Sequence, residues 1–249
     1  MKKAIDIHTH INHKSRFDSA PDSLLCDASL EYLIKMNEAA GIKKMFCSTF
    51  SSVISTEELE AENEFLYKLA QTTDCLYQWV VMDPRIKNTF IQAEAMLKSP
   101  KCAGIKLHPP YHGYSIEEYG DEIFSFAQKL RAIVLIHPEE SPDYILPFAD
   151  KYPDVTFIMA HMGFFREESY ADAIEFSKNR NVYADTSGSA STKNKVVEYV
   201  VERVGSDRIL FGTDTYAAGF QKGRIEYALI SDEDKENILF KNAERLFGK

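Results

Sequence analysis

Short apolar runs recur along the chain at intervals that fit one strand and one helix each. Eight of these runs, often rich in β-branched residues, cover 4–7, 44–50, 76–82, 103–107, 132–136, 155–160, 181–185 and 208–212. Such near-continuous apolar character is typical of strands that are buried on both faces of a parallel sheet. We therefore expect eight strands.

The segments between these runs carry apolar residues at helical spacing. In the segment 29–41, Leu30, Leu33 and Ile34 recur at this spacing, and Gly41 follows as a suitable residue after a helix end. The same reasoning predicts helices over 55–71, 115–131, 168–179, 191–205 and 232–247. Strands that alternate with helices predict an α/β chain with a parallel sheet.

Polar residues at the strand ends distinguish a closed barrel from an open sheet. Five of the seven histidines follow a predicted strand, and an aspartate follows the last one: His8, His10, His108, His137, His161 and Asp214. In a parallel barrel the C-terminal ends of all strands meet at one face, whereas in an open sheet the first, fifth, sixth and eighth strands would not all be neighbours. We predict a single (β/α)8 TIM barrel over residues 1–249, a usual length for this fold.

Alternation along the first strand, IDIHTH, suggests how its side chains point. A period of two places Asp6, His8 and His10 on one face and Ile5 and Ile7 on the other. We expect the apolar face to meet the helices and the histidine face to look into the barrel mouth.

Imidazoles and a carboxylate gathered at one point indicate a metal site. Neutral imidazole nitrogens and a carboxylate bind Zn²⁺, and less selectively iron, cobalt or manganese. Zn²⁺ would lower the pKa of a bound water to about 7. The two remaining histidines, His13 and His112, fall in predicted loops and are expected to be solvated or hydrogen-bonded side chains.

Charge and composition narrow the class of partner. The chain has 29 Lys and Arg against 38 Asp and Glu, so its net charge of −9 argues against nucleic acid. We find no apolar window long enough for a membrane span and no signal peptide, and the four cysteines show no paired spacing. We expect a cytoplasmic protein with reduced thiols and a small-molecule substrate, and with neither nucleic acid nor membrane as partner; a homo-oligomer is compatible with the sequence.

The ordered motifs IDIHTH, GIKLHPP, VLIHPE, FIMAHMG and ILFGTDT resemble those of the amidohydrolase superfamily. The nearer resemblance is to its amidohydrolase-2 branch, which includes aminocarboxymuconate-semialdehyde decarboxylase together with related hydrolases and hydratases. The resemblance extends from Ala4 to about Asp214 and implies a (β/α)8 barrel with one or two divalent metals. The combination of motifs in this order is specific, whereas each motif alone is not.

The resemblance assigns roles to individual residues. It implies that His8, His10 and His137 are metal ligands, together with Asp214, which also takes a proton from metal-bound water. It implies that His161 is a catalytic base or electrophile beside one metal, or a ligand where there are two.

Lys106 has two interpretations under this resemblance. It lies where binuclear relatives such as dihydroorotases carry a carbamylated lysine, and it could bridge two metals in that form. Without carbamylation its ammonium could bind a substrate carboxylate or pair with an acid. Because amidohydrolase-2 members are mostly mononuclear, we expect one ion, most simply zinc, with Lys106 and His108 contributing to substrate binding.

These features predict a metal-dependent hydrolase of a small amide, ester or lactone, in which metal-activated water attacks and Asp214 shuttles the proton. The alternatives are a decarboxylase or lyase on the same scaffold and a non-catalytic metal-bearing barrel. TatD-like deoxyribonucleases share the barrel and the HxH motif, but GIKLHPPYHG has no acid where they carry a glutamate ligand. We expect the polar segment 12–27, with Lys14 and Arg16, to form a lid, and Arg85 or Arg166 is a further candidate for gripping an anion.

Overall fold

The chain folds into one sheet of eight parallel strands, in the order β1 to β8. The structure is a computed structural model that describes residues 2–13, 28–166 and 168–248. Each strand pairs with the next one along the chain. The strands are β1 (Ala4–Ile11), β2 (Ile42–Thr49), β3 (Leu76–Val81), β4 (Cys102–Leu107), β5 (Ile133–Ile136), β6 (Thr156–Met159), β7 (Val182–Asp185) and β8 (Ile209–Leu210).

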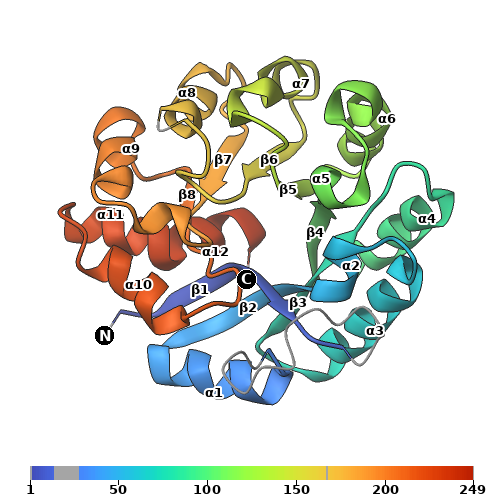
Figure 1. The fold of residues 1–249 in the computed structure, drawn as a ribbon, viewed down its shortest axis with the longest axis horizontal. Helices are drawn as coiled ribbons and strands as arrows, with labels where there is room; N and C mark the ends of the chain where they lie inside the picture. Colours follow the sequence, from blue (N-terminus) through green and yellow to red (C-terminus); the bar gives the residue numbers. More distant parts are fainter. Residues whose placement is uncertain (1, 14–27, 167, 249) are drawn as a thin grey trace.

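Backbone hydrogen bonds between β1 and the segment around β8 bring the two edges of the sheet together. The N–H of Ile7 donates to the carbonyl of Phe211 at 2.9 Å. The N–H groups of Thr213 and Asp214 both donate to the carbonyl of His8, at 3.1 and 2.8 Å. The predicted single (β/α)8 barrel is therefore confirmed (Figure 1).

Helices surround the barrel, as Figure 1 shows. All six segments predicted as helical contain helix. The helices at 50–54, 87–96, 109–112, 146–151 and 218–226 lie outside those segments. No helix within the described residues is both long and apolar enough to cross a membrane. The helices are α1 (Leu30–Ala40), α2 (Phe50–Ile54), α3 (Leu59–Thr72), α4 (Lys87–Met96), α5 (Pro109–His112), α6 (Ile116–Lys129), α7 (Leu146–Lys151), α8 (Ser169–Phe176), α9 (Val196–Val204), α10 (Ala218–Glu226), α11 (Asp232–Glu236) and α12 (Asn242–Phe247), with a π-helical turn at Asn237–Lys241 between the last two.

Two apolar layers hold the barrel. The outer layer packs strand residues such as Val134 and Ile136 against helix residues such as Phe124. A separate cluster combines residues from strands all around the barrel with the C-terminal helix α12: Ile5, Ile7, Phe46, Trp79, Leu135, Ile158, Leu210 and Ala243. Phe247 of α12 packs edge-on against Trp79, with ring centroids 5.8 Å apart. The C-terminal helix thus packs onto the barrel interior.

The strict alternation expected along β1 is wrong. Ile5 and Ile7 pack in the interior cluster with α12 and are absent from the outer layer, where strands meet the surrounding helices. The register between β1 and β2 shifts between Asp6 and Thr9, and such an irregularity changes which side the following residues face. The shift lets Ile7 fill the interior while the next residue, His8, lines the cavity described below.

Candidate metal centre

A cavity of about 320 Å³ lies at the C-terminal ends of the strands, where the barrel prediction places the active site. It collects residues from β1 and β4 and from the segments that follow β2, β4, β5, β6 and β8. The structure brings together here every site residue that the sequence predicts. The lining residues are His8, His10, Phe50, Val53, Ile54, Lys106, His108, Tyr111, His137, His161, Asp214 and Tyr216.

His8 is held from behind by a buried carboxylate. Its Nδ1 lies 2.8 Å from Oδ2 of Asp185, and both side chains are almost fully buried. Its Nε2 faces the other way, 3.1 Å from Nζ of Lys106 and 3.8 Å from Oδ1 of Asp214. Burial and the nearby charge of Lys106 lower the pKa of His8 to about 3, so the ring is neutral at pH 7.

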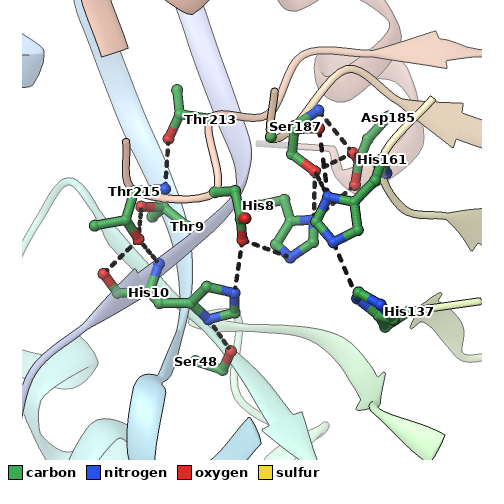
Figure 2. A network of polar contacts seen from close by, with 12 residues as sticks. His8, Thr9, His10, Ser48, His137, His161, Asp185, Ser187, Thr213 and Thr215 are labelled. Carbon is green, nitrogen blue, oxygen red and sulfur yellow. Dashed lines mark hydrogen bonds and ion pairs between the residues drawn. The ribbon is translucent and has the colours of Figure 1, made fainter. Parts of the chain in front are cut away.

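His10 contacts Asp214 directly. Its Nε2 lies 3.1 Å from Oδ1 of Asp214, and its Nδ1 lies 2.9 Å from Oγ of Ser48 (Figure 2). The hydroxyl of Ser48 can donate or accept, so His10 has access to both neutral tautomers. Burial lowers the pKa of His10. Burial opposes ionisation of Asp214, but the hydrogen bond from His10 and the nearby histidines hold its pKa well below the usual range.

His137 pairs with His161. Its Nδ1 lies 3.1 Å from Nε2 of His161, and the rings meet edge to face with centroids 4.8 Å apart. Burial lowers the pKa of His137 to about 2, with the neighbouring His161 as the next cause. His137 thus lines the same cavity as the proposed ligands but contacts His161 rather than Asp214.

The two residues expected to bind substrate both reach the cavity. Burial lowers the pKa of Lys106 to about 8, against the attraction of Asp185 and Asp214, so its ammonium form predominates at pH 7. His108 stacks between two rings, at 4.1 Å from His137 and 4.5 Å from Tyr111. Burial lowers the pKa of His108, so it enters the cavity as a neutral ring.

Left-handed backbone conformations occur at the site. His161 has a φ of 65° and Asp214 a φ of 56°, although neither is glycine. Gly188 has a φ of 74°, and a Cβ there would lie 3.1 Å from Nδ1 of His161. This position therefore requires glycine both for its backbone and for the space beside the histidine.

Sequence reasoning missed Asp185 and Ser187, which lie behind the histidines. Asp185 ends β7 and is fully buried, and Ser187 follows in the next turn. A signal was present in the sequence, because the seventh apolar run ends in an acid, as the eighth run is followed by one. Of the residues at the strand ends, only histidines and Asp214 were predicted as site residues.

Arg85 and Arg166, which the sequence suggested as residues that bind an anionic substrate, contact other groups. Arg85 donates to the carboxylate of Asp83 and to the backbone carbonyls of His112 and Gly113, so it fixes the turn after β4. Arg166 donates to Asp172 at 2.8 Å. Neither is among the residues that line the cavity. Lys14, Arg16 and most of the predicted lid 12–27 lie outside the described residues.

The donor atoms suit a divalent metal. Among the described residues, His8, His10 and Asp214 offer ligand atoms that all lie within 4.8 Å of one another. The two imidazoles are neutral and the carboxylate is ionised, which is the protonation state that metal binding requires. A second group, formed by His8, His161 and Asp185, meets the same distance criterion, but there Asp185 already accepts the hydrogen bond of His8.

Three solved structures with a similar fold are described as enzymes, one of them putative, whose names include a small acid. A 2,6-dihydroxybenzoate decarboxylase from Rhizobium is 16% identical over 100% of this chain and 99% of its own, with a TM-score of 0.76. A dihydroxybenzoic acid decarboxylase from Polaromonas sp. JS666, with bound manganese and the inhibitor 2-nitroresorcinol, is 19% identical over 100% and 97%, with a TM-score of 0.75. A putative 2-pyrone-4,6-dicarboxylic acid hydrolase from Pseudomonas putida is 16% identical over 99% and 97%, with a TM-score of 0.71.

The family is shown by a sequence model rather than by these structures. No curated protein matches the chain in sequence. The model of the family described as Amidohydrolase matches residues 5–249, which include the metal donors and the whole barrel. The resemblance read from the ordered motifs is thereby confirmed, and the chain belongs to the amidohydrolase family.

Proposed function

We propose that the protein is a metal-dependent decarboxylase of a small carboxylic acid. The observation that carries this proposal is the composition of one cavity, in which the metal donors share the space with a buried ammonium group, that of Lys106. Phe50, Val53 and Tyr216 add apolar walls that suit the carbon skeleton of such an acid. The similarity to decarboxylases supports this alternative over hydrolysis, our first expectation.

One divalent ion would be held by His8, His10 and Asp214, with His137 as the further ligand that the family resemblance implies. When bound, the ion would polarise a substrate oxygen and stabilise negative charge that develops on it. Manganese is as strong a candidate as the zinc we expected, because two of the similar decarboxylases are described with bound manganese. Both metals accept imidazole and carboxylate ligands.

The remaining polar groups would bind the substrate and move a proton. The ammonium of Lys106 would bind a substrate carboxylate, and His108 would donate a hydrogen bond beside it. When the bond to the carboxylate carbon breaks and CO₂ leaves, the remaining carbon needs one proton. Asp214 and His161 both face the cavity and would deliver it from solvent.

Hydrolysis of an ester, amide or lactone is the second candidate. The observation that favours it is the position of the Asp214 carboxylate, which lines the cavity 3.1 Å from Nε2 of His10, where it would take a proton from water. The described cysteines Cys47, Cys75 and Cys102 are free thiols, which supports the expected reducing, cytoplasmic location for either activity.

An assay that follows both products separates the two candidates. Protein loaded with manganese or with zinc would be given hydroxybenzoic acids and related unsaturated acids, and CO₂ release measured. The same preparations would be given lactones, esters and N-acyl compounds, and acid release measured. CO₂ release that is lost in Asp214→Asn supports decarboxylation; acid release without CO₂ release contradicts it in favour of hydrolysis.

A further inference from the structure

Behind the metal donors lies a buried carboxylate whose oxygens are fully used. Oδ1 of Asp185 accepts the backbone N–H of Ser187 at 2.9 Å and that of His161 at 3.1 Å. It also accepts the hydroxyl of Ser187. Oδ2 lies 2.8 Å from Nδ1 of His8. Backbone N–H and hydroxyl groups donate in these three contacts, so Oδ1 carries no proton.

This carboxylate determines which nitrogen of His8 carries the proton. A neutral imidazole has one N–H and one lone pair. The ammonium of Lys106 only donates and lies 3.1 Å from Nε2, so Nε2 accepts, and Nδ1 carries the proton that it donates to Oδ2 of Asp185. The lone pair is then on Nε2, which faces the cavity beside Lys106 and Asp214.

Ser187 applies the same constraint to His161. Its hydroxyl proton goes to Asp185, so Oγ is left to accept, and Nδ1 of His161 lies 2.9 Å from it. The carbonyl oxygen of Ser187, which also only accepts, lies 3.3 Å from the same nitrogen. Nδ1 of His161 therefore carries the proton, and its Nε2 lone pair points toward His137 (Figure 2).

We propose that Asp185 and Ser187 are a positioning pair that holds His8 and His161 in the same Nδ1–H tautomer, so that both Nε2 lone pairs face the active cavity. One hydroxyl joins the two rings, because Oγ of Ser187 is 2.9 Å from Nδ1 of each. The pair thus couples a metal ligand to the proposed proton-transfer residue. This inference rests on the proposed function for the roles of the two histidines, but not for their tautomers.

The Asp185 and Ser187 pair and the two histidines are closely packed by neighbouring backbone. A Cβ at Gly212 would lie 2.9 Å from Cβ of His8 and 3.0 Å from Cβ of Ser187, so the backbone of the neighbouring segment presses both side chains into place. Gly188 plays the equivalent part beside His161. An orienting partner that is buried and closely packed holds a histidine ring more firmly than one that is exposed to water.

The tautomers are directly measurable in the protein labelled with ¹⁵N-histidine. Long-range ¹H–¹⁵N spectra assign the protonated nitrogen of each neutral ring, in the metal-free protein and after zinc is added. We expect Nδ1–H for both His8 and His161 in the metal-free wild type. An Nε2–H tautomer at either ring would overturn the proposal, whether or not a substrate has been found.

Asp185→Asn tests whether Asp185 fixes the tautomer of His8. The amide nitrogen can donate to Nδ1 of His8, which would move the ring proton to Nε2 and block metal binding. We expect zinc affinity, measured by competition with a chelator, to fall about 10- to 100-fold, the usual effect of losing a partner that orients a ligand. Wild-type zinc affinity with an unchanged His8 tautomer would contradict the proposal.

Ser187→Ala tests whether Ser187 fixes the tautomer of His161, and Ser191→Ala is the matched control. Ser191 is a buried serine in the same segment, and its hydroxyl donates to the carbonyl of Thr186 at 2.6 Å. In Ser187→Ala we expect His8 to keep its tautomer and zinc affinity to stay within about 3-fold of wild type. His161 keeps only the longer contact to the carbonyl of residue 187, so its Nδ1–H form loses population and kcat falls at least about 10-fold at unchanged KM. Equal spectra and kinetics in the two variants would sink the proposal. Tautomers as expected in a protein that is inactive toward every acid would instead refute the proposed function.

Discussion

Oδ1 of Asp214 lies 3.1 Å from Nε2 of His10, although one residue follows the last strand and the other belongs to the first. Backbone contacts set this distance, because the N–H of Asp214 donates to the carbonyl of His8 at 2.8 Å. The same bonds bring the sheet edges together. Barrel closure and assembly of the metal donors are therefore one structural event.

Asp214→Asn separates the two roles proposed for this residue. The amide oxygen keeps a ligand atom, but the side chain is no longer a base. We expect metal content close to that of wild type and a loss of turnover of more than about 100-fold, the scale of a lost proton shuttle. Elemental analysis and steady-state kinetics measure the two effects. Turnover near wild type would refute the proton-transfer role.

His10→Ala removes one proposed ligand. We expect metal content after purification to fall and the thermal stabilisation produced by added metal to shrink, because ligand binding stabilises the folded state in proportion to its affinity. His13→Ala is the control, since His13 contacts Glu62 and Phe65 and is not among the residues that line the cavity. Equal metal content in the two variants would contradict the ligand assignment.

Lys106→Met keeps most of the length of the unbranched side chain and removes its charge. A hydrogen bond to a charged group contributes about 1.5–3 kcal/mol, so we expect KM for an acid substrate to rise by roughly 10- to 100-fold. Lys222→Met is a matched control, because Lys222 is equally buried but pairs with Glu226 at 2.8 Å on α10. A KM that is unchanged in Lys106→Met, or that rises equally in the control, would argue against carboxylate binding.

The ion pair between Glu198 and Arg224 predicts a pH effect on stability away from the cavity. Burial opposes ionisation of Glu198, but hydrogen bonds from Arg224 and the backbone of Leu229 lower its pKa to about 2. The ordinary pKa of a glutamate side chain is 4.5, so the ion pair stabilises the folded state above pH 4.5, and this contribution is lost as the pH falls toward 2.

Urea unfolding at several pH values measures this contribution. We expect Glu198→Gln to be destabilised by on the order of 1–2 kcal/mol at pH 7 and to lose less stability than wild type between about pH 4.5 and pH 2. Parallel curves for the two proteins over that range would show that the ion pair contributes nothing.

The strands and the polar residues at their ends were predictable because each signal is local. Buried parallel strands read as apolar runs, and the histidines after them mark the barrel mouth. Helices α4 and α10 were not predicted, because the local signals for a helix are weak in both segments. α4 has no side-chain cap at its N-terminus, and α10 contains Gly219 and Gly223, which lower its helical propensity.

The site was predictable in its composition but not in its pairing. Periodicity could not reveal the register shift in β1, which places Ile7 inside the barrel and turns His8 to the cavity. The pairing of His137 with His161 depends on ring orientations that a sequence does not encode locally. Asp185 was not predicted because its role is to hold another side chain, and that role appears only once barrel closure brings the end of β7 within reach of His8 on β1.

The left-handed backbone at His161 and Asp214 implies a trade between durability and activity. Such conformations cost on the order of 1–3 kcal/mol each in residues with a Cβ, and glycine would adopt them with less strain. The two residues that would move protons therefore lower the stability of the folded state. A selection for heat resistance alone should replace these residues first and yield a sturdier barrel that no longer turns over its substrate.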